Sequence, residues 1–148
     1  MAMVRRRTFL VAAASAVGAI ALAGAPAAAQ SAALRQAVLG FEDGVSWAAV
    51  SPAWAAQRGA WLASVRGASS PAALGAAILQ LEGAMGWSSV QNSWRTRRAG
   101  WVAAMQSAAS DHGVAALLIE LEAVTQWSAM RPTWRAARTP WLARVSAI

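Results

Sequence analysis

Cysteine, lysine and tyrosine are absent from this chain of 148 residues, and histidine occurs once. Without cysteine there is no disulfide framework, no thiolate metal site and no cysteine nucleophile. Stability must therefore come from packing alone. Charged residues make up only 13% of the chain and apolar residues 57%, which is the opposite of the composition of disordered proteins. We therefore expect a packed globular domain.

The residues that catalysis needs are equally scarce. His112, the one histidine, is predicted to lie in a loop and has no second metal ligand at a suitable spacing. Three carboxylates outside the repeated pattern described below, Asp43, Asp111 and Glu120, form no evident acid–base pair. The serines lack a G-x-S-x-G turn, and no glycine-rich phosphate loop is present. We therefore expect a protein that is not an enzyme and that uses no metal or cofactor.

The first thirty residues have the three parts of a secretory signal peptide. Arg5-Arg6-Arg7 precede an uncharged run from Phe9 to Gly24, and the small residues Ala27-Ala28-Ala29 follow. We predict a signal peptide over residues 1–29 with cleavage after Ala29, and a location in the periplasm or outside the cell. Pro26 and the Ala-x-Ala site disfavour the alternative of an uncleaved membrane anchor. No later run is long and apolar enough to predict a membrane-spanning segment.

The start of this segment also carries a more specific motif. Residues 6–10 read Arg-Arg-Thr-Phe-Leu, which resembles the R-R-x-F-L motif of bacterial twin-arginine signal peptides. The Ala/Gly-rich, moderately hydrophobic middle is similar to such signals as well. The resemblance implies export of an already folded protein. Arg5 stands where these signals usually have serine or threonine, so the general secretory route stays an alternative.

The rest of the chain repeats itself at an interval of 40 residues. A shift of 40 aligns three tryptophans, one glutamate and one arginine in each of three copies, which we place at residues 30–69, 70–109 and 110–148. The aligned residues are Glu42, Trp47, Trp54, Arg58 and Trp61, then Glu82, Trp87, Trp94, Arg98 and Trp101, then Glu122, Trp127, Trp134, Arg138 and Trp141. Because these positions include all nine tryptophans of the chain, we interpret the three copies as one structural unit used three times.

Each copy has apolar residues at helical spacing. In the first copy Leu34, Val38, Phe41 and Val45 fall on one helix face, and a second stripe begins at Trp54. The connections are short, so neighbouring helices must run antiparallel. The sequence therefore predicts an all-α fold of three tandem helical hairpins, or about six helices. Both a solenoid-like open superhelix and a compact closed bundle are compatible with this pattern.

Local signals predict where the second helices begin and whether the last one is regular. Ser51 followed by Pro52 predicts a capped helix start, since serine is a good N-cap and proline is tolerated at the first helical position. Thr139-Pro140 predicts a kink or a break in the last helix, because proline removes a backbone donor.

The hairpin geometry predicts which repeated residues face each other. In a hairpin that turns near residues 50 and 51, Glu42 lies opposite Arg58, with Trp54 and Trp61 one turn to either side of that arginine. We expect an ion pair packed between indole rings, as part of the structural core of every copy. The alternative is that these residues line a ligand groove. If the first helix of each copy continues to Trp47 and its equivalents, they fall off its apolar face. The alternatives for them are contact with a neighbouring copy, capping of the core at the turn, and exposure.

The second copy contains the pattern L-x-L-E-x4-W, formed by Leu79, Leu81, Glu82 and Trp87, followed by W-x3-R-x2-W. This pattern resembles a helical segment found beside reader modules in eukaryotic chromatin-remodelling subunits. The resemblance covers one hairpin and consists mostly of packing residues. An exported protein meets no chromatin, so we transfer no function from it and expect no nucleic-acid partner.

The charge balance indicates the kind of partner. Without the predicted signal peptide, ten arginines stand against six acidic residues, a net charge of +4 that weakly favours anionic partners. A candidate patch for an anionic partner comprises Arg95, Arg97, Arg131, Arg135 and Arg144. Our hypothesis is an exported, non-catalytic binding or scaffold protein of the cell envelope, whose partner is a protein or an anionic envelope polymer. The alternatives are a carbohydrate- or cell-wall-binding module with exposed tryptophans and a protein that associates with the membrane surface.

Overall fold

The computed structural model describes residues 27–148, so the predicted signal peptide lies outside the described residues except for Ala27–Ala29. The described part is all-α, as predicted, and contains no strand. Its elements are α1 (Ala27–Gly44), α2 (Trp47–Val50), α3 (Trp54–Gly67), α4 (Pro71–Met85), α5 (Trp94–Ser107), α6 (Asp111–Val124) and α7 (Trp134–Ser146), with two 3-10 turns, η1 (Trp87–Ser89) and η2 (Trp127–Ala129). None of these helices combines the length and the apolar character needed to cross a membrane.

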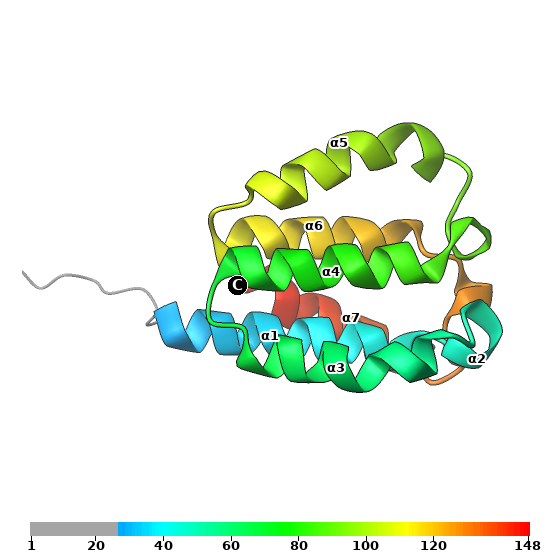
Figure 1. Cartoon of the computed structure of the whole chain (residues 1–148), viewed down its shortest axis with the longest axis horizontal. Coiled ribbons are helices and arrows are strands. Elements are labelled where there is room, and N and C mark those ends of the chain that lie inside the picture. The colour runs from blue at the N-terminus through cyan, green and yellow to red at the C-terminus, as the bar shows by residue number, and fades with distance from the viewer. Residues whose placement is uncertain (1–26) are drawn as a thin grey trace, which may run out of the picture.

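Within residues 27–148, three inner helices and three outer helices form a bundle. The inner helices α1, α4 and α6 all contact one another, and each outer helix packs between two of them. Thus α3 lies against α1 and α4, α5 against α4 and α6, and α7 against α6 and α1. The turns within the three hairpins lie together at one end of the bundle, and the connections between hairpins lie at the other end (Figure 1). We call the first of these, formed by residues 45–53, 86–93 and 125–133, the loop end.

The apolar stripe of the inner helices forms the centre of the core. Leu34, Val38, Phe41 and Val45 are at most 1% exposed. The equivalent residues of the second and third repeats, along α4 and α6, are buried too. Each such side chain contributes about 1.5 to 3 kcal/mol when it leaves water. Since every inner helix contacts both others, the helical periodicity of the sequence is used to fill one shared core.

The outer helices begin later than the Ser51-Pro52 signal predicts. Trp54 is the first residue of α3, and its backbone N–H donates to the Ser51 carbonyl across a turn, at 2.9 Å. The residue before the helix, Ala53, already has helical backbone angles and makes no side-chain cap. The predicted cap at Ser51 is therefore wrong, because the chain makes a complete turn before the helix starts. True serine caps occur at Ser70 and Ser110, which begin the inner helices α4 and α6.

Pro140 does not interrupt the last helix. It lies inside α7, which continues from Trp134 to Ser146. The side chain of Pro140 is exposed. The predicted break is therefore absent. Trp134, Trp141 and Val145, on both sides of Pro140, are buried in the core and stabilise α7 as one helix.

The third repeat closes onto the first, so the three hairpins form a ring. The indole N–H of Trp61 donates to the Ala77 carbonyl of the next inner helix at 2.8 Å, and Trp101 does the same to Leu117 at 2.9 Å. Trp141 continues this series by donating at 2.9 Å to a carbonyl of α1, that of Ala37. Of the two arrangements that the sequence allowed, the structure is therefore the closed bundle.

The backbone adds two links at the loop end. Isolated antiparallel bridges join Val45 to Met130 and Val90 to Thr125. They connect the third repeat to the first and to the second. The described residues show no corresponding bridge between the first and second repeats.

Gly44 sets how closely the first and third repeats approach. A Cβ atom at Gly44 would lie 2.4 Å from Cε3 of the buried Trp134 ring. We expect Gly44→Ala to lower the free energy of unfolding by about 1 to 3 kcal/mol, the usual cost of overpacking, measured by urea denaturation. Gly100→Ala is the matched control, because Gly100 is exposed in α5 with no atom within 4 Å. It should stabilise by about 0.5 to 1 kcal/mol through helix propensity. Equal effects of both changes would contradict the close approach.

Candidate binding site at the loop end

The repeated glutamate and arginine form a two-point ion pair in all three hairpins. In the second repeat, Arg98 donates from Nε to Glu82 Oε1 at 2.7 Å and from Nη2 to Oε2 at 2.8 Å. The first and third repeats have the same geometry. The Trp94 indole N–H also donates to Glu82 Oε1, at 3.1 Å. The carboxylate is only 6% exposed, whereas the arginine side chain is 37% exposed. The acid is thus inside the protein, and the outer edge of the guanidinium reaches the surface.

The ion pairs keep the arginines charged. Hydrogen bonding to Glu82 raises the pKa of Arg98 above that of a free arginine, against a smaller opposing effect of burial. Glu42 and Glu122 raise the pKa of Arg58 and Arg138 in the same way. A raised pKa means that folding favours the protonated form. These side chains are therefore cations at every physiological pH.

The indoles around the ion pair differ from the predicted arrangement. Trp94 and Trp101 pack edge to face with ring centroids 5.2 Å apart, and both are buried. The expected sandwich of Arg98 between these two rings is wrong, because both N–H groups point to acceptors inside the bundle. Instead Arg98 lies over Trp87, with its guanidinium carbon 5.8 Å from the ring centroid. The physical reason is that α4 ends at Met85, before Trp87. The Trp87 ring therefore leaves the face of α4 and lies against arginines of the outer helix α5.

At the loop end, arginine side chains therefore lie over the rings of two exposed tryptophans. Trp87 is 47% exposed and Trp127 is 51% exposed. Arg95 lies 5.1 Å from the Trp87 ring, in addition to Arg98. In the third repeat, Arg135 and Arg138 lie 5.4 and 5.8 Å from the Trp127 ring. We call these two clusters, Trp87 with its two arginines and Trp127 with its two, the Trp–Arg sites.

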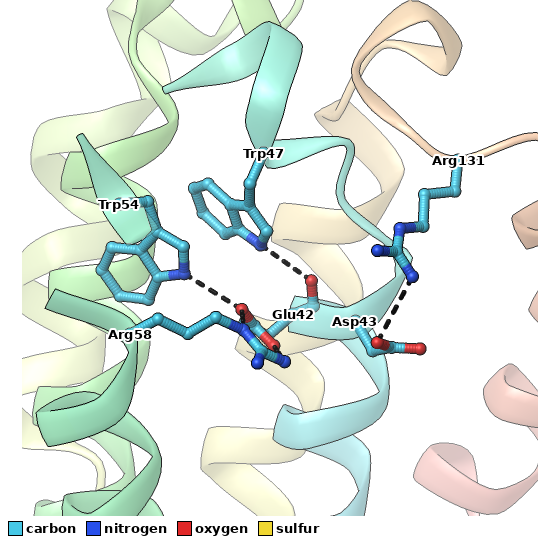
Figure 2. Close-up of polar contacts among 6 residues, drawn as sticks. All are labelled: Glu42, Asp43, Trp47, Trp54, Arg58 and Arg131. Carbon is cyan, nitrogen blue, oxygen red and sulfur yellow. Dashed lines mark hydrogen bonds and ion pairs between the residues drawn. The ribbon is translucent and has the colours of Figure 1, made fainter. Parts of the chain in front are cut away.

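The first repeat has a different arrangement at the same position. Trp47 stacks on Trp54 with ring centroids 4.8 Å apart and an interplanar angle of 25°. Its indole N–H donates to the Glu42 backbone carbonyl at 2.9 Å, as Figure 2 shows. Residue 55 is alanine here, whereas the equivalent residues 95 and 135 are arginine. Without that arginine, the ring of Trp47 lies against its aromatic neighbour and is only partly exposed.

The five arginines of the patch suggested by the sequence do not form one surface in the structure. Arg95 and Arg135 belong to the Trp–Arg sites. Arg97 forms an exposed ion pair with Glu120, and Arg131 lies 3.5 Å from Asp43. Arg144 lies in the last turn of α7, at the end of the bundle away from the loop end.

Sequence reasoning missed the contact between arginine and the first tryptophan of the repeat. It placed Trp47, Trp87 and Trp127 off the core face but assigned them no partner. The available signal was that residues 95 and 135 are both arginine and residue 55 is not. Because that arginine lies one turn before the ion-paired one on the outer helix, both reach the same indole.

The groups that would indicate catalysis do not gather at this end. His112, which we expected in a loop, is the second residue of α6 and is exposed. Among the described residues, no cluster of three or more histidine, aspartate or glutamate side chains is placed to hold a metal ion. What the loop end offers chemically is indole faces, fixed cations and satisfied carboxylates, which are groups suited to binding.

Residues 28–86 match a family model described as a domain of unknown function (DUF8799). The match covers less than half of the chain and runs from the second residue of α1 to the residue after α4. It includes the first ion pair and the stacked tryptophans of the first repeat. Comparison with curated proteins and with solved structures gives no match. The likeness is thus to a domain whose description states no activity.

Proposed function

We propose that this protein is an exported, non-catalytic binding or scaffold module of the cell envelope. Its ligand is an anionic envelope polymer, which contacts the two Trp–Arg sites. Export to the periplasm or the exterior is part of the proposal and is supported by the sequence pattern of residues 1–29. The single observation that carries the proposal is the exposure of Trp87 and Trp127 beneath charged arginines at the loop end.

Exposure of these rings is informative because Trp47 is only partly exposed and the other six repeated tryptophans are shielded. Trp54, Trp61, Trp94, Trp101, Trp134 and Trp141 are at most 3% exposed. Exposed aromatic residues flanked by arginine are typical of contact surfaces, where an indole supplies area and a guanidinium supplies charge and donors. Arg98 and Arg138 are held in place by their buried glutamates, so little freedom is lost when a ligand binds.

The proposal predicts that two arginines control binding of a polyanion. We expect the full chain to bind polygalacturonate, and the double variant Arg95→Ala/Arg135→Ala to bind about tenfold more weakly, since two exposed charge contacts are lost. Isothermal titration at low salt would measure this, and affinity should fall as salt is added.

A matched control removes the same charge elsewhere. Arg66 and Arg144 are exposed in the last turns of α3 and α7, away from the loop end. Arg66→Ala/Arg144→Ala should change the affinity less than twofold, within the small effect of distant screened charges. Equal losses in both double variants would show that only net charge matters and would contradict the proposal. If the protein binds anionic vesicles but does not bind polygalacturonate, its anionic partner is a membrane surface and not a polymer.

A further inference from the structure

The first repeat contains a groove that is larger than the hollows at the equivalent positions of the second and third repeats. It has a volume of about 500 Å³ and is lined by residues that include Trp47, Trp54, Arg58, Asp43 and Arg131. The corresponding hollows at the second and third repeats measure about 210 and 270 Å³. Pockets that bind small ligands have volumes of roughly 300 to 1,000 Å³. Of these three sites, only the groove of the first repeat reaches that range.

Three departures from the repeat lie together at this groove. Asp43 stands where the other copies have glycine and alanine, and Ala55 stands where both have arginine. Arg131 comes from the third repeat, at a position that is serine in the first and glutamine in the second. Arg131 is far from Asp43 and Ala55 in the sequence, yet all three residues line the same groove. The core of the repeat needs none of them, because the other two copies fold without them.

The groove combines an aromatic wall with balanced charges. Trp47 supplies the aromatic wall and stacks on the fully buried Trp54 behind it. The charge of Arg58 is balanced by Glu42, at 2.7 Å. Asp43 and Arg131 lie 3.5 Å apart, and their side chains are 68% and 56% exposed. In Figure 2 this pair lies to the right of Glu42, and Trp54 and Arg58 lie to its left. Because each acid has its own arginine, the groove attracts neither an anion nor a cation strongly, but it presents exposed donors and acceptors.

We propose that this groove binds a neutral sugar ring of a glycan. The apolar C–H face of a pyranose matches an indole, and its hydroxyls match planar groups that donate or accept hydrogen bonds. Asp43 accepts from a hydroxyl, and Arg131 together with the free edge of Arg58 donates to ring or hydroxyl oxygens. The site shares no residue with the Trp–Arg sites, so it does not depend on the function proposed above.

The test uses the full chain labelled with ¹⁵N, whose nine tryptophans give separate indole N–H signals. Cellotetraose, maltotetraose and chitotetraose are titrated to millimolar concentration, with glucuronate as the anionic probe. We expect at least one neutral oligosaccharide to shift the indole signal of Trp47, assigned with Trp47→Phe. No shift with any of the three, or a shift with glucuronate alone, overturns the proposal.

Variants then locate the site. Asp43→Ala should raise Kd for the active oligosaccharide about tenfold, since one charge-assisted hydrogen bond is lost. Ala55→Arg restores the arginine of the other repeats to the groove wall and should raise Kd by at least about tenfold. Ala56→Arg is the matched control, because Ala56 is exposed beside Ala55 but does not line the groove. It should leave Kd unchanged.

Equal effects of Ala55→Arg and Ala56→Arg, or no effect of Asp43→Ala, would place binding elsewhere and overturn the proposal. Polygalacturonate binding is measured separately, so failure of either proposal is seen independently of the other.

Discussion

Replacing Trp141 with alanine is expected to lower the free energy of unfolding by about 3 to 5 kcal/mol, the usual loss for a buried aromatic side chain. Trp141 is 2% exposed, lies 6.0 Å from the Phe41 ring and donates a hydrogen bond to the Ala37 carbonyl. All of these contacts reach back to the first repeat. In an open superhelix, the last repeat would have no such neighbour. Urea denaturation followed by circular dichroism would measure the loss.

Two comparisons make this result specific to closure of the ring. Trp101→Ala, in the second repeat, should be about as destabilising as Trp141→Ala, because both indoles occupy equivalent places between repeats. Trp127→Ala removes an exposed ring and should change stability by less than about 1 kcal/mol. A loss at Trp141 no larger than that at Trp127 would show that the third repeat does not pack onto the first.

Breaking the ion pair of the second repeat is the other large effect that we expect. Glu82→Ala and Arg98→Ala should each destabilise the protein by about 3 kcal/mol, at the lower end for a broken buried pair because Arg98 is partly exposed. Removing Arg98 leaves a buried carboxylate without its cation. Removing Glu82 also deprives the buried Trp94 N–H of its acceptor. Thermal and urea melts of both variants would measure these losses.

The double variant tests whether the two residues act through each other. Glu82→Ala/Arg98→Ala should be less destabilising than the sum of the single changes by at least about 1 kcal/mol, as expected for contacting residues. Glu82→Gln is a milder comparison, because an amide oxygen still accepts from Trp94. If the single losses simply add, the pair is not coupled and its stabilising role must be abandoned.

Sequence reasoning predicted the local structure well because local structure depends on neighbouring residues. The spacing of Leu34, Val38, Phe41 and Val45 predicts an amphipathic helix with one buried face, and these residues are in the core. It failed where a short signal competes with tertiary packing. Pro140 lies within a continuous helix because the apolar side chains of α7 are anchored in the core.

The candidate sites were harder to predict, since they depend on contacts across the repeats. Nothing near Asp43 in the sequence indicates that Arg131 lies beside it. The direction in which Trp87 folds is also not encoded by periodicity, because it depends on where α4 ends and on Arg95 and Arg98 above the ring.

The sequence by itself determined that helical hairpins form, that there are three of them, and that an acid faces an arginine in each. Those features follow from spacings within one repeat of 40 residues. Only the tertiary structure decided that the ring closes, that Trp87 and Trp127 stay exposed, and that the first repeat has the large groove. The physical reason is that identical units leave their mutual rotation undetermined. Contacts such as that between Gly44 and Trp134 fix this rotation only when distant parts of the chain meet.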